Sequence, residues 1–301
     1  MTDADEVEGS AAGGPRPLEP VPLTPDARAT ALLRLIRIVE RLRAPDGCPW
    51  DREQTLRSLA PTLIEEAHEL VEAIETGDVR AECEEAGDVL LVVALLAQVA
   101  DEDGRFDLEA AAQGVGDKLV RRHPHVFGDV TVDGAGGAIA NWEAIKQSER
   151  AARKGDDASA LAGVPRAMGA VQRAQRLGAK AMASGFRWED ARGALAKLQE
   201  EVEELTEAFE RAGCASDGQA PPPGPERAHL EAELGDVLLA AAQLANYVEV
   251  DGEAVAREAA RRFEARFRAM ELELRGELRS RSLAELMAAW QRAKVEVAKS
   301  D

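Results

Sequence analysis

The sequence predicts an all-α fold, and three observations support this prediction. Aromatic residues make up only 4% of the 301 residues, whereas hydrophobic residues reach 45%, so Leu, Ala and Val must fill the core. Ala, Leu, Glu and Arg favour helices, while the β-branched and aromatic residues that favour strands are thinly represented. Two acidic clusters of the same design, each readable as a pair of helices, lie in the two halves of the chain.

The composition along the chain predicts two tandem helical-bundle repeats. We expect a disordered tail at residues 1–28, a first helical domain at 29–150, a linker at 151–165 and a second helical domain at 166–301. The tail is acidic, rich in Pro and Gly, and lacks the apolar segment of a signal peptide. The linker is polar and ends in Pro165, which a helix does not readily accommodate.

In the first domain, apolar residues at helical spacing predict a helix over residues 30–43. Two prolines and a glycine predict a loop over residues 44–51. A helix after Pro61 carries LIEEAHEL, and a TGD turn leads into a second helix with EEAGDVLL that ends at Gly104. The remaining expected elements are a helix around residues 117–122, a Gly-rich loop over 131–138 and a helix near Trp142.

The second domain repeats this plan. GFRWED around Trp188 is loosely similar to CPWDRE around Trp50, and LQEEVEEL is followed by LEAELGDVLL. Between these two acidic segments lies an insert at residues 212–228, whose Pro and Gly content predicts a loop. The order of the elements therefore indicates an internal duplication with one inserted loop.

The acidic clusters predict metal binding. Residues three or four apart share a helix face, so each half presents carboxylates from two helices. Converging carboxylates repel one another unless a cation holds them, and Mg²⁺ or Mn²⁺ prefers such oxygen ligands. A solvated acidic surface is the alternative for either cluster taken alone. The acidic residues are Glu65, Glu66, Glu69, Glu85 and Asp88 in the first half, and Glu200, Glu201, Glu204, Glu233 and Asp236 in the second.

Basic residues and tryptophans recur in the same order after each acidic cluster. Together they indicate a clamp for a polyphosphate, because Arg and Lys bind phosphate oxygens well. Ordinary surface charge is the alternative for each residue alone, and the two tryptophans either stack on a base or close a core. The recurring residues are Lys118, Arg122, Trp142 and Lys146 in the first half, and Arg262, Arg266, Trp290 and Lys294 in the second.

Charge and composition exclude several classes of protein. A net charge of −19 argues against a nucleic-acid polymer as partner, because such a partner needs a basic surface. No apolar run reaches the ~20 residues of a membrane helix. Cys48, Cys83 and Cys214 form no C-x-x-C pair, which predicts reduced thiols in a cytoplasmic protein. Without a P-loop or a GxGxxG motif, any nucleotide chemistry must depend on metals.

The order of the motifs resembles one known family. CPWD, EExxE, ExxD, KLxRRHPHVF and NWExxK, followed by a second EExxE and ExxD, are similar to MazG-type nucleoside triphosphate pyrophosphohydrolases over residues 30–296. The resemblance implies helical-bundle repeats that pair with a second chain in a homodimer. It also implies Mg²⁺-dependent hydrolysis of a nucleoside triphosphate to the monophosphate and pyrophosphate, by water attack at the α-phosphorus, for nucleotide-pool housecleaning.

The resemblance also implies roles for single residues, with the second repeat as the main catalytic unit. We expect Glu200 to orient or deprotonate the water, within a catalytic group of Glu200, Glu201 and Glu204. His229 stands where relatives commonly have a lysine, which puts one phosphate contact in doubt. The implied metal ligands are Glu201, Glu204, Glu233 and Asp236, with Glu66, Glu69, Glu85 and Asp88 as their counterparts. The implied nucleotide-binding residues are Lys197, Glu200, Arg262, Arg266, Trp290 and Lys294.

Two other functions fit the same sequence. One is a related all-α enzyme of narrower substrate range, of the dUTPase-like or phosphoribosyl-ATP pyrophosphohydrolase type. The other is a non-catalytic helical scaffold whose acidic faces bind a partner or cations. Turnover confined to one nucleotide would favour the first, and a lack of any metal-dependent turnover would favour the second.

Overall fold

The structure, a computed structural model, describes residues 26–152, 157, 159–213 and 221–298. It divides into two compact units, Met1–Asp156 and Asp157–Asp301, which are called the first and the second unit below. The border between the units falls inside the expected linker, residues 151–165. Residues 1–25 of the expected tail lie outside the described residues.

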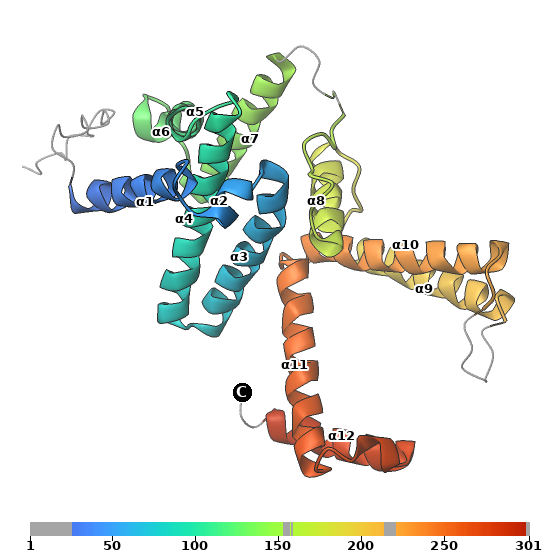
Figure 1. The fold of residues 1–301 in the computed structure, drawn as a ribbon. Helices are drawn as coiled ribbons and strands as arrows, with labels where there is room; N and C mark the ends of the chain where they lie inside the picture. Colours follow the sequence, from blue (N-terminus) through green and yellow to red (C-terminus); the bar gives the residue numbers. More distant parts are fainter. Residues whose placement is uncertain (1–25, 153–156, 158, 214–220, 299–301) are drawn as a thin grey trace, which may run out of the picture. The chain divides into compact units, whose positions relative to one another are not determined.

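The described residues form helices and no β-strand, which confirms the predicted all-α fold (Figure 1). No described helix is both long enough and apolar enough to cross a membrane. The first unit contains α1 (Ala27–Arg43), α2 (Pro49–Glu53), α3 (Leu56–Thr76), α4 (Val79–Glu102), α5 (Leu108–Arg122), α6 (Pro124–Phe127) and α7 (Gly134–Ala152). The second unit contains α8 (Ala170–Ala183), α9 (Ala191–Arg211), α10 (Pro225–Tyr247), α11 (Gly252–Glu273), a short 3₁₀ helix η1 (Leu278–Ser280) and α12 (Leu283–Val297).

Helices α3 and α4 form the centre of the first unit. Gly77 ends α3 with φ 72°, a left-handed conformation that glycine adopts without steric penalty. Asp78 then caps α4, and its carboxylate accepts hydrogen bonds from the backbone N–H groups of Arg80 (3.0 Å) and Ala81 (3.1 Å). This tight connection makes the two helices antiparallel neighbours, so that their acidic segments face the same region (Figure 1).

Helix α1 closes the core of the first unit. Val39 of α1 belongs to one buried apolar cluster with Leu59 of α3 and with Leu95 and Val99 of α4. Arg43, at the end of α1, forms a 2.6 Å ion pair with Glu102 at the end of α4. The core is therefore continuous from α1 across both central helices.

In the second unit, α9 and α10 pair as α3 and α4 do, and α8 packs on α10. Gly178 of α8 is buried, and a Cβ atom there would lie 2.9 Å from Cγ of Gln243 on α10. A larger residue at this position would therefore force the Gln243 side chain to move. The amide of Gln175 joins α8 to the chain before α11, because it donates to the Val250 carbonyl (2.7 Å) and accepts from the Gly252 N–H (2.8 Å).

Helix α11 connects this three-helix group to α12. Its N-terminal turn contacts α8, where Glu253 accepts a 3.1 Å hydrogen bond from the backbone N–H of Gln172. Its C-terminal part packs on α12 through buried Met270, Ala289 and Ala293. Since a helix rises about 1.5 Å per residue, these two contact regions are separated by roughly 25 Å along α11.

Two predicted boundaries in the first unit were wrong. The helix expected to follow Pro61 begins earlier, at Leu56, and contains this proline. Thr55 and Ser58 form a capping box that starts the helix one and a half turns before Pro61, so the missing N–H costs only one interior hydrogen bond. The predicted loop over residues 44–51 contains the start of the short helix α2, which has Pro49 in its first turn.

Two other predicted loops are partly helical. Helix α7 begins at Gly134, inside the expected loop over residues 131–138. Helix α10 begins at Pro225, inside the insert at 212–228, because proline is well tolerated in the first turn of a helix. Residues 214–220 of this insert lie outside the described residues.

Candidate active site

In the second unit, three of the predicted ligands converge from the facing helices α9 and α10. Glu201 and Glu204 on α9 and Glu233 on α10 each offer an oxygen within 4.8 Å of the others. Glu201 is buried, with 8% of its surface exposed. Asp236, the fourth predicted ligand, follows Glu233 by three residues on α10, is exposed, and does not belong to this group. The carboxylates thus form an oxygen-rich cluster of the kind that suits Mg²⁺ or Mn²⁺.

Lys197 is the cation of this cluster. Its ammonium group lies 2.7 Å from a Glu200 oxygen and 2.8 Å from a Glu201 oxygen, one turn further along α9. The hydrogen bonds to Glu200 and then Glu201 raise the pKa of Lys197 above its ordinary value, so the lysine stays charged. Loss of hydration, followed by repulsion from Glu201, raises the pKa of Glu204. The cluster therefore carries strong negative charge with one cation beside it.

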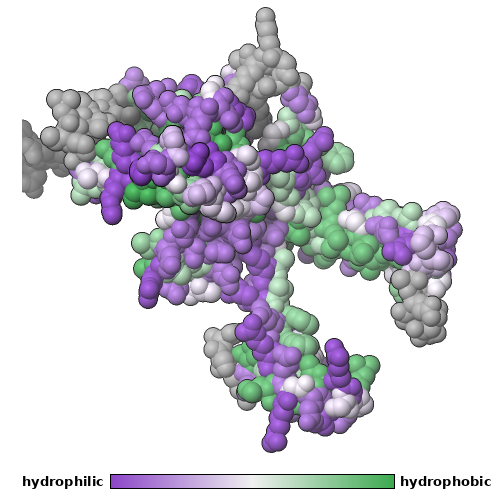
Figure 2. Space-filling model, in the orientation of Figure 1, coloured by the Kyte–Doolittle hydropathy of each residue, from purple (hydrophilic) through white to green (hydrophobic). Residues whose placement is uncertain are grey.

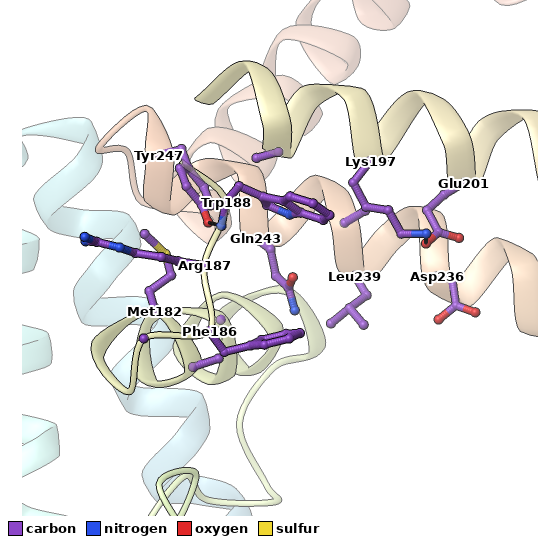
Figure 3. Close-up of a pocket in the computed structure, with 15 residues that line it drawn as sticks. Met182, Phe186, Arg187, Trp188, Lys197, Glu201, Asp236, Leu239, Gln243 and Tyr247 are labelled. Carbon is purple, nitrogen blue, oxygen red and sulfur yellow. Dashed lines mark hydrogen bonds and ion pairs between the residues drawn. The ribbon is translucent and has the colours of Figure 1, made fainter. Parts of the chain in front are cut away.

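A cavity opens directly beside these charged residues (Figure 3). Its volume is ≈ 370 Å³, within the range of small-molecule sites. Lys197, Glu201 and Asp236 line one end of it, and mainly apolar and aromatic residues line the rest. The latter group includes Met182, Phe186, Trp188, Leu239 and Tyr247, together with the amide of Gln243.

The first unit brings together a corresponding set of carboxylates. Glu66 on α3 and Glu85 and Asp88 on α4 each offer an oxygen within 4.8 Å of the others, whereas Glu69 lies outside this group. Loss of hydration, followed by repulsion from Glu69 and Asp88, raises the pKa of Glu66 and of Glu85. Thr62 occupies the position four residues before Glu66, where the second unit has Lys197 before Glu201.

The remaining residues expected to bind nucleotide lie on α11 and α12, and none of them lines the cavity. Arg262 forms a 3.0 Å ion pair with Glu258 on its own helix. The Nε atom of Arg266 is buried and has no hydrogen-bond partner among the described residues. Trp290 packs in the α11–α12 contact, with its ring 5.2 Å from that of Phe263, and Lys294 is exposed one turn further along α12. Within one chain, these residues and the carboxylates are not brought together.

Their counterparts in the first unit make internal contacts. Arg121 and Arg122 both pair with Glu149 of α7, each at 2.6 Å, and the Arg122 guanidinium lies 5.1 Å from the centre of the Trp142 ring. These two arginines lower the pKa of Glu149 to about 2. Lys146 pairs with Glu143 at 3.2 Å. Of the predicted phosphate clamp of the first unit, Arg122 and Trp142 therefore join α5 to α7, and Lys146 is paired within α7.

His229 lies beside the metal-type cluster of the second unit. Its Nδ1 atom is 3.3 Å from an oxygen of Glu233, one turn further along α10. An imidazole here contacts a carboxylate of the cluster, and it does not line the cavity.

Several cavity residues were not among the predicted site residues: Phe186, Trp188, Gln243 and Tyr247. The similarity between GFRWED and CPWDRE was the one sequence signal that could have directed attention to Trp188. Gln243 and Tyr247, with Asn246, are the polar residues of a mainly apolar stretch after Asp236 on α10, and no motif distinguishes them.

Two all-α units, each with carboxylates that converge from one pair of helices, match the architecture that the resemblance to the all-α nucleotide pyrophosphohydrolases implied. The family model of the MazG nucleotide pyrophosphohydrolase domain matches this chain twice, at residues 54–127 and 191–269. The chain therefore belongs to the MazG family, which confirms the predicted family and the prediction that the protein is a hydrolase.

Curated relatives agree with this family. The nucleoside triphosphate pyrophosphohydrolase/pyrophosphatase MazG of Thermotoga maritima is 39% identical over 237 residues, which cover 79% of this chain and 84% of the relative. The nucleoside triphosphate pyrophosphohydrolase of Escherichia coli strain K12 is 37% identical over 265 residues, or 87% of this chain and 96% of the relative. A crystal structure of a mazG-related protein from Thermotoga maritima covers 38% of this chain and 98% of its own, at 33% identity and a TM-score of 0.34.

Proposed function

We propose that this MazG protein hydrolyses nucleoside and deoxynucleoside triphosphates to the monophosphate and pyrophosphate, and that the second unit is the main catalytic unit. The observation that carries the proposal is the convergence of Glu201, Glu204 and Glu233 beside a cavity that also contains Lys197. A carboxylate cluster alone would repel a triphosphate. With a lysine and an open cavity beside it, the carboxylate cluster can bind a metal ion and the phosphates of a substrate together.

The carboxylates of the second unit fit Mg²⁺, or Mn²⁺ as an alternative. All of their donors are oxygens. Loss of hydration, followed by repulsion from Glu201, raises the pKa of Glu204, and a bound divalent cation would favour its charged form. Glu201, Glu204, Glu233 and Asp236 would hold the metal. When bound, it would offset the charge of the phosphates and favour deprotonation of the attacking water.

The protein's own groups have distinct proposed roles. Glu200 is exposed next to the cluster, so its carboxylate is available to orient the water or to accept its proton. Lys197 now bonds to Glu200 and Glu201, and its flexible side chain can transfer to a phosphate oxygen when substrate binds. There it would stabilise the charge that develops on the departing pyrophosphate.

We further propose that the enzyme acts as a homodimer in which α11 and α12 of a second copy complete the site. The cavity of one chain is not lined by its own Arg262, Arg266, Trp290 or Lys294. In a homodimer, these residues of a second copy can supply the contacts to the nucleotide. Apolar surface along α9 and α10 supports this arrangement (Figure 2). On α9 it is exposed at heptad spacing, and α10 adds two leucines; the residues are Leu195, Val202, Phe209, Leu234 and Leu238.

The proposed physiological role is housecleaning of the nucleotide pool in the cytoplasm. The broad range of triphosphates and the location are supported by the family and by a cysteine content without paired motifs. Turnover of one nucleotide alone would instead favour an enzyme of narrow specificity.

The test compares matched substitutions in the two units. Glu201→Gln removes one buried carboxylate charge with little change of shape, and we expect it to lower Mg²⁺-dependent pyrophosphate release from ATP by about 100-fold or more. Glu66→Gln is the same change in the first unit and should leave most of the release intact. Pyrophosphate and AMP are quantified with each common nucleoside triphosphate, with and without EDTA.

Three outcomes would change the proposal. Undiminished release by Glu201→Gln together with loss in Glu66→Gln would move catalysis to the first unit. Undiminished release by the double variant would contradict a carboxylate-based site. Wild-type protein with no metal-dependent release would contradict the proposed activity as a whole.

A further inference from the structure

We propose that the apolar part of the cavity in the second unit binds the nucleobase of the substrate. In this assignment Phe186 and Trp188 provide stacking surfaces, and the Gln243 amide contacts the polar edge of the base. The inference rests on the proposed function, because it names the part of that site that holds the base.

The loop between α8 and α9 fixes the two aromatic residues at the cavity. Gly185 turns the chain with φ 95°, a conformation that favours glycine, and the Phe186 N–H then donates to the Ala181 carbonyl at 3.0 Å. The backbone N–H of Trp188 donates to the hydroxyl of Tyr247 on α10 at 2.8 Å. The loop is thus held at both ends by backbone hydrogen bonds, independently of the aromatic rings.

The exposure of these rings is not explained by folding. Phe186 is 83% exposed and Trp188 is 48% exposed, although both line the cavity. A large apolar ring in this position contributes little to the core, whereas it offers a face on which a planar ligand can stack. Figure 3 shows the Trp188 ring above and the Phe186 ring below in this view, with the Gln243 side chain between them.

The chemistry of Gln243 suits a base. Its amide has both donors and an acceptor, and it can rotate to match the hydrogen-bonding groups of different bases. A site with aromatic faces and one such amide therefore accepts several bases, because stacking has little dependence on base identity. This agrees with a broad range of triphosphates.

The position of the cavity relative to the charged residues determines how a bound nucleotide is oriented. Lys197, Glu201 and Asp236 line the same cavity as Phe186 and Trp188. A nucleotide with its base among the aromatic residues would extend its phosphates toward the carboxylates and the lysine. The base would then set the position of the α-phosphorus.

In the first unit, the residues at the corresponding positions are large, apolar and buried. Seven and eleven residues after Asp88 are Leu95 and Val99, which are buried in the apolar cluster. The corresponding residues after Asp236 are Gln243 and Tyr247. Leu59, seven residues before Glu66, is likewise buried, and Ala194 takes its place in the second unit. At these positions the second unit therefore has smaller or polar residues that line its cavity, whereas the first unit has large apolar residues buried in its core.

The experiment measures binding, so that the base site is separated from catalysis. The probes are α,β-methylene-ATP, whose α–β bridge resists hydrolysis, and inorganic tripolyphosphate, which has no base, both with Mg²⁺ and the full-length protein. We expect Trp188→Ala to weaken binding of α,β-methylene-ATP by about 10-fold, the effect of losing one stacking face, and to leave tripolyphosphate binding within about 2-fold.

Two further variants make the result interpretable. Trp50→Ala removes the corresponding tryptophan of the first unit, which is 64% exposed, and should change neither affinity. Phe186→Ala changes a more exposed ring that contributes little to folding, and should repeat the selective loss of Trp188→Ala.

Equal losses for both probes, or no loss for α,β-methylene-ATP in either Trp188→Ala or Phe186→Ala, would overturn the base site. If the wild-type protein still releases pyrophosphate from ATP, only the base site is contradicted and the proposed function stands. If the wild-type protein releases no pyrophosphate, the proposed function itself is contradicted.

Discussion

In the first unit, the two helices that carry three converging carboxylates, α3 and α4, also contribute Leu59, Leu95 and Val99 to a buried apolar cluster. In the second unit, three carboxylates of α9 and α10 lie beside a cavity. The acidic groups are thus alike, while their surroundings differ. Carboxylates that can bind a metal do not by themselves distinguish an active unit from a structural one. In the proposed function, the cavity and Lys197 next to the carboxylates are what make the second unit the main catalytic unit.

The two units also differ in the cations near their carboxylates. Glu200 and Glu201 share Lys197, whereas Thr62 occupies the corresponding position before Glu66. In the first unit, Arg121 and Arg122 are engaged with Glu149. Two arginines of the first unit therefore join α5 to α7, whereas Lys197 of the second unit lines the cavity.

Exchanging the lysine and the threonine between the units should have the largest effect. We expect Lys197→Thr to lower the kcat of pyrophosphate release by between about 100- and 1000-fold, because it removes the cation that stabilises charge in the transition state. The reciprocal Thr62→Lys should leave kcat unchanged. The measurement is steady-state release of pyrophosphate from ATP at saturating Mg²⁺.

Lys197→Arg controls for charge alone and should recover part of the loss. Should Lys197→Thr remain within a few-fold of the wild type, the difference between the units would not reside in this lysine.

A polar residue should be poorly tolerated in the filled core of the first unit. Leu95→Gln places in a buried apolar cluster the amide that the second unit has at Gln243 beside its cavity. We expect the free energy of unfolding to fall by about 2 kcal/mol, as for an amide buried without compensating hydrogen bonds. Urea denaturation followed by circular dichroism measures the change.

Leu90→Gln is the matched control, since Leu90 lies on the same helix and is half exposed. An equally small effect of both substitutions would indicate that the first unit also has room at this position.

The duplicated plan and the acidic helix pairs were predictable because residues three or four apart must share a helix face. The positions of Glu201, Glu204 and Glu233 follow from this rule and from the pairing of α9 with α10. The cavity could not be predicted in this way. It depends on which small residues of other helices line it, such as Gly178 and Ala194, and helical spacing does not report that volume.

The start of α3 was mispredicted for a related reason. Proline was taken to precede the helix, but the capping box at Thr55 and Ser58 stabilises a turn before it. The capping box therefore decided where the helix starts, against the general preference of proline for the first turn of a helix.

The smallest expected effect concerns pH and the pairing of Glu149 in the first unit. Arg122 and Arg121 lower the pKa of this carboxyl to about 2 from its ordinary value of 4.5. A lowered pKa in the folded state stabilises the protein at every pH above the unfolded value. As pH falls from about 4.5 toward 2, the unfolded chain takes up the proton first, so this stabilisation is lost.

Glu149→Gln should therefore lower the urea midpoint by a constant amount between pH 7 and pH 5, and by progressively less at pH 4 and pH 3. Arg122→Met should remove most of the same pH-dependent difference, because Arg122 is the main cause of the lowered pKa. High salt should reduce the effect, since Arg121 is half exposed and its pair with Glu149 is open to screening. A difference between wild type and Glu149→Gln that persists unchanged at pH 3 would mean that the carboxylate stabilises α5 against α7 by its shape and not by its charge.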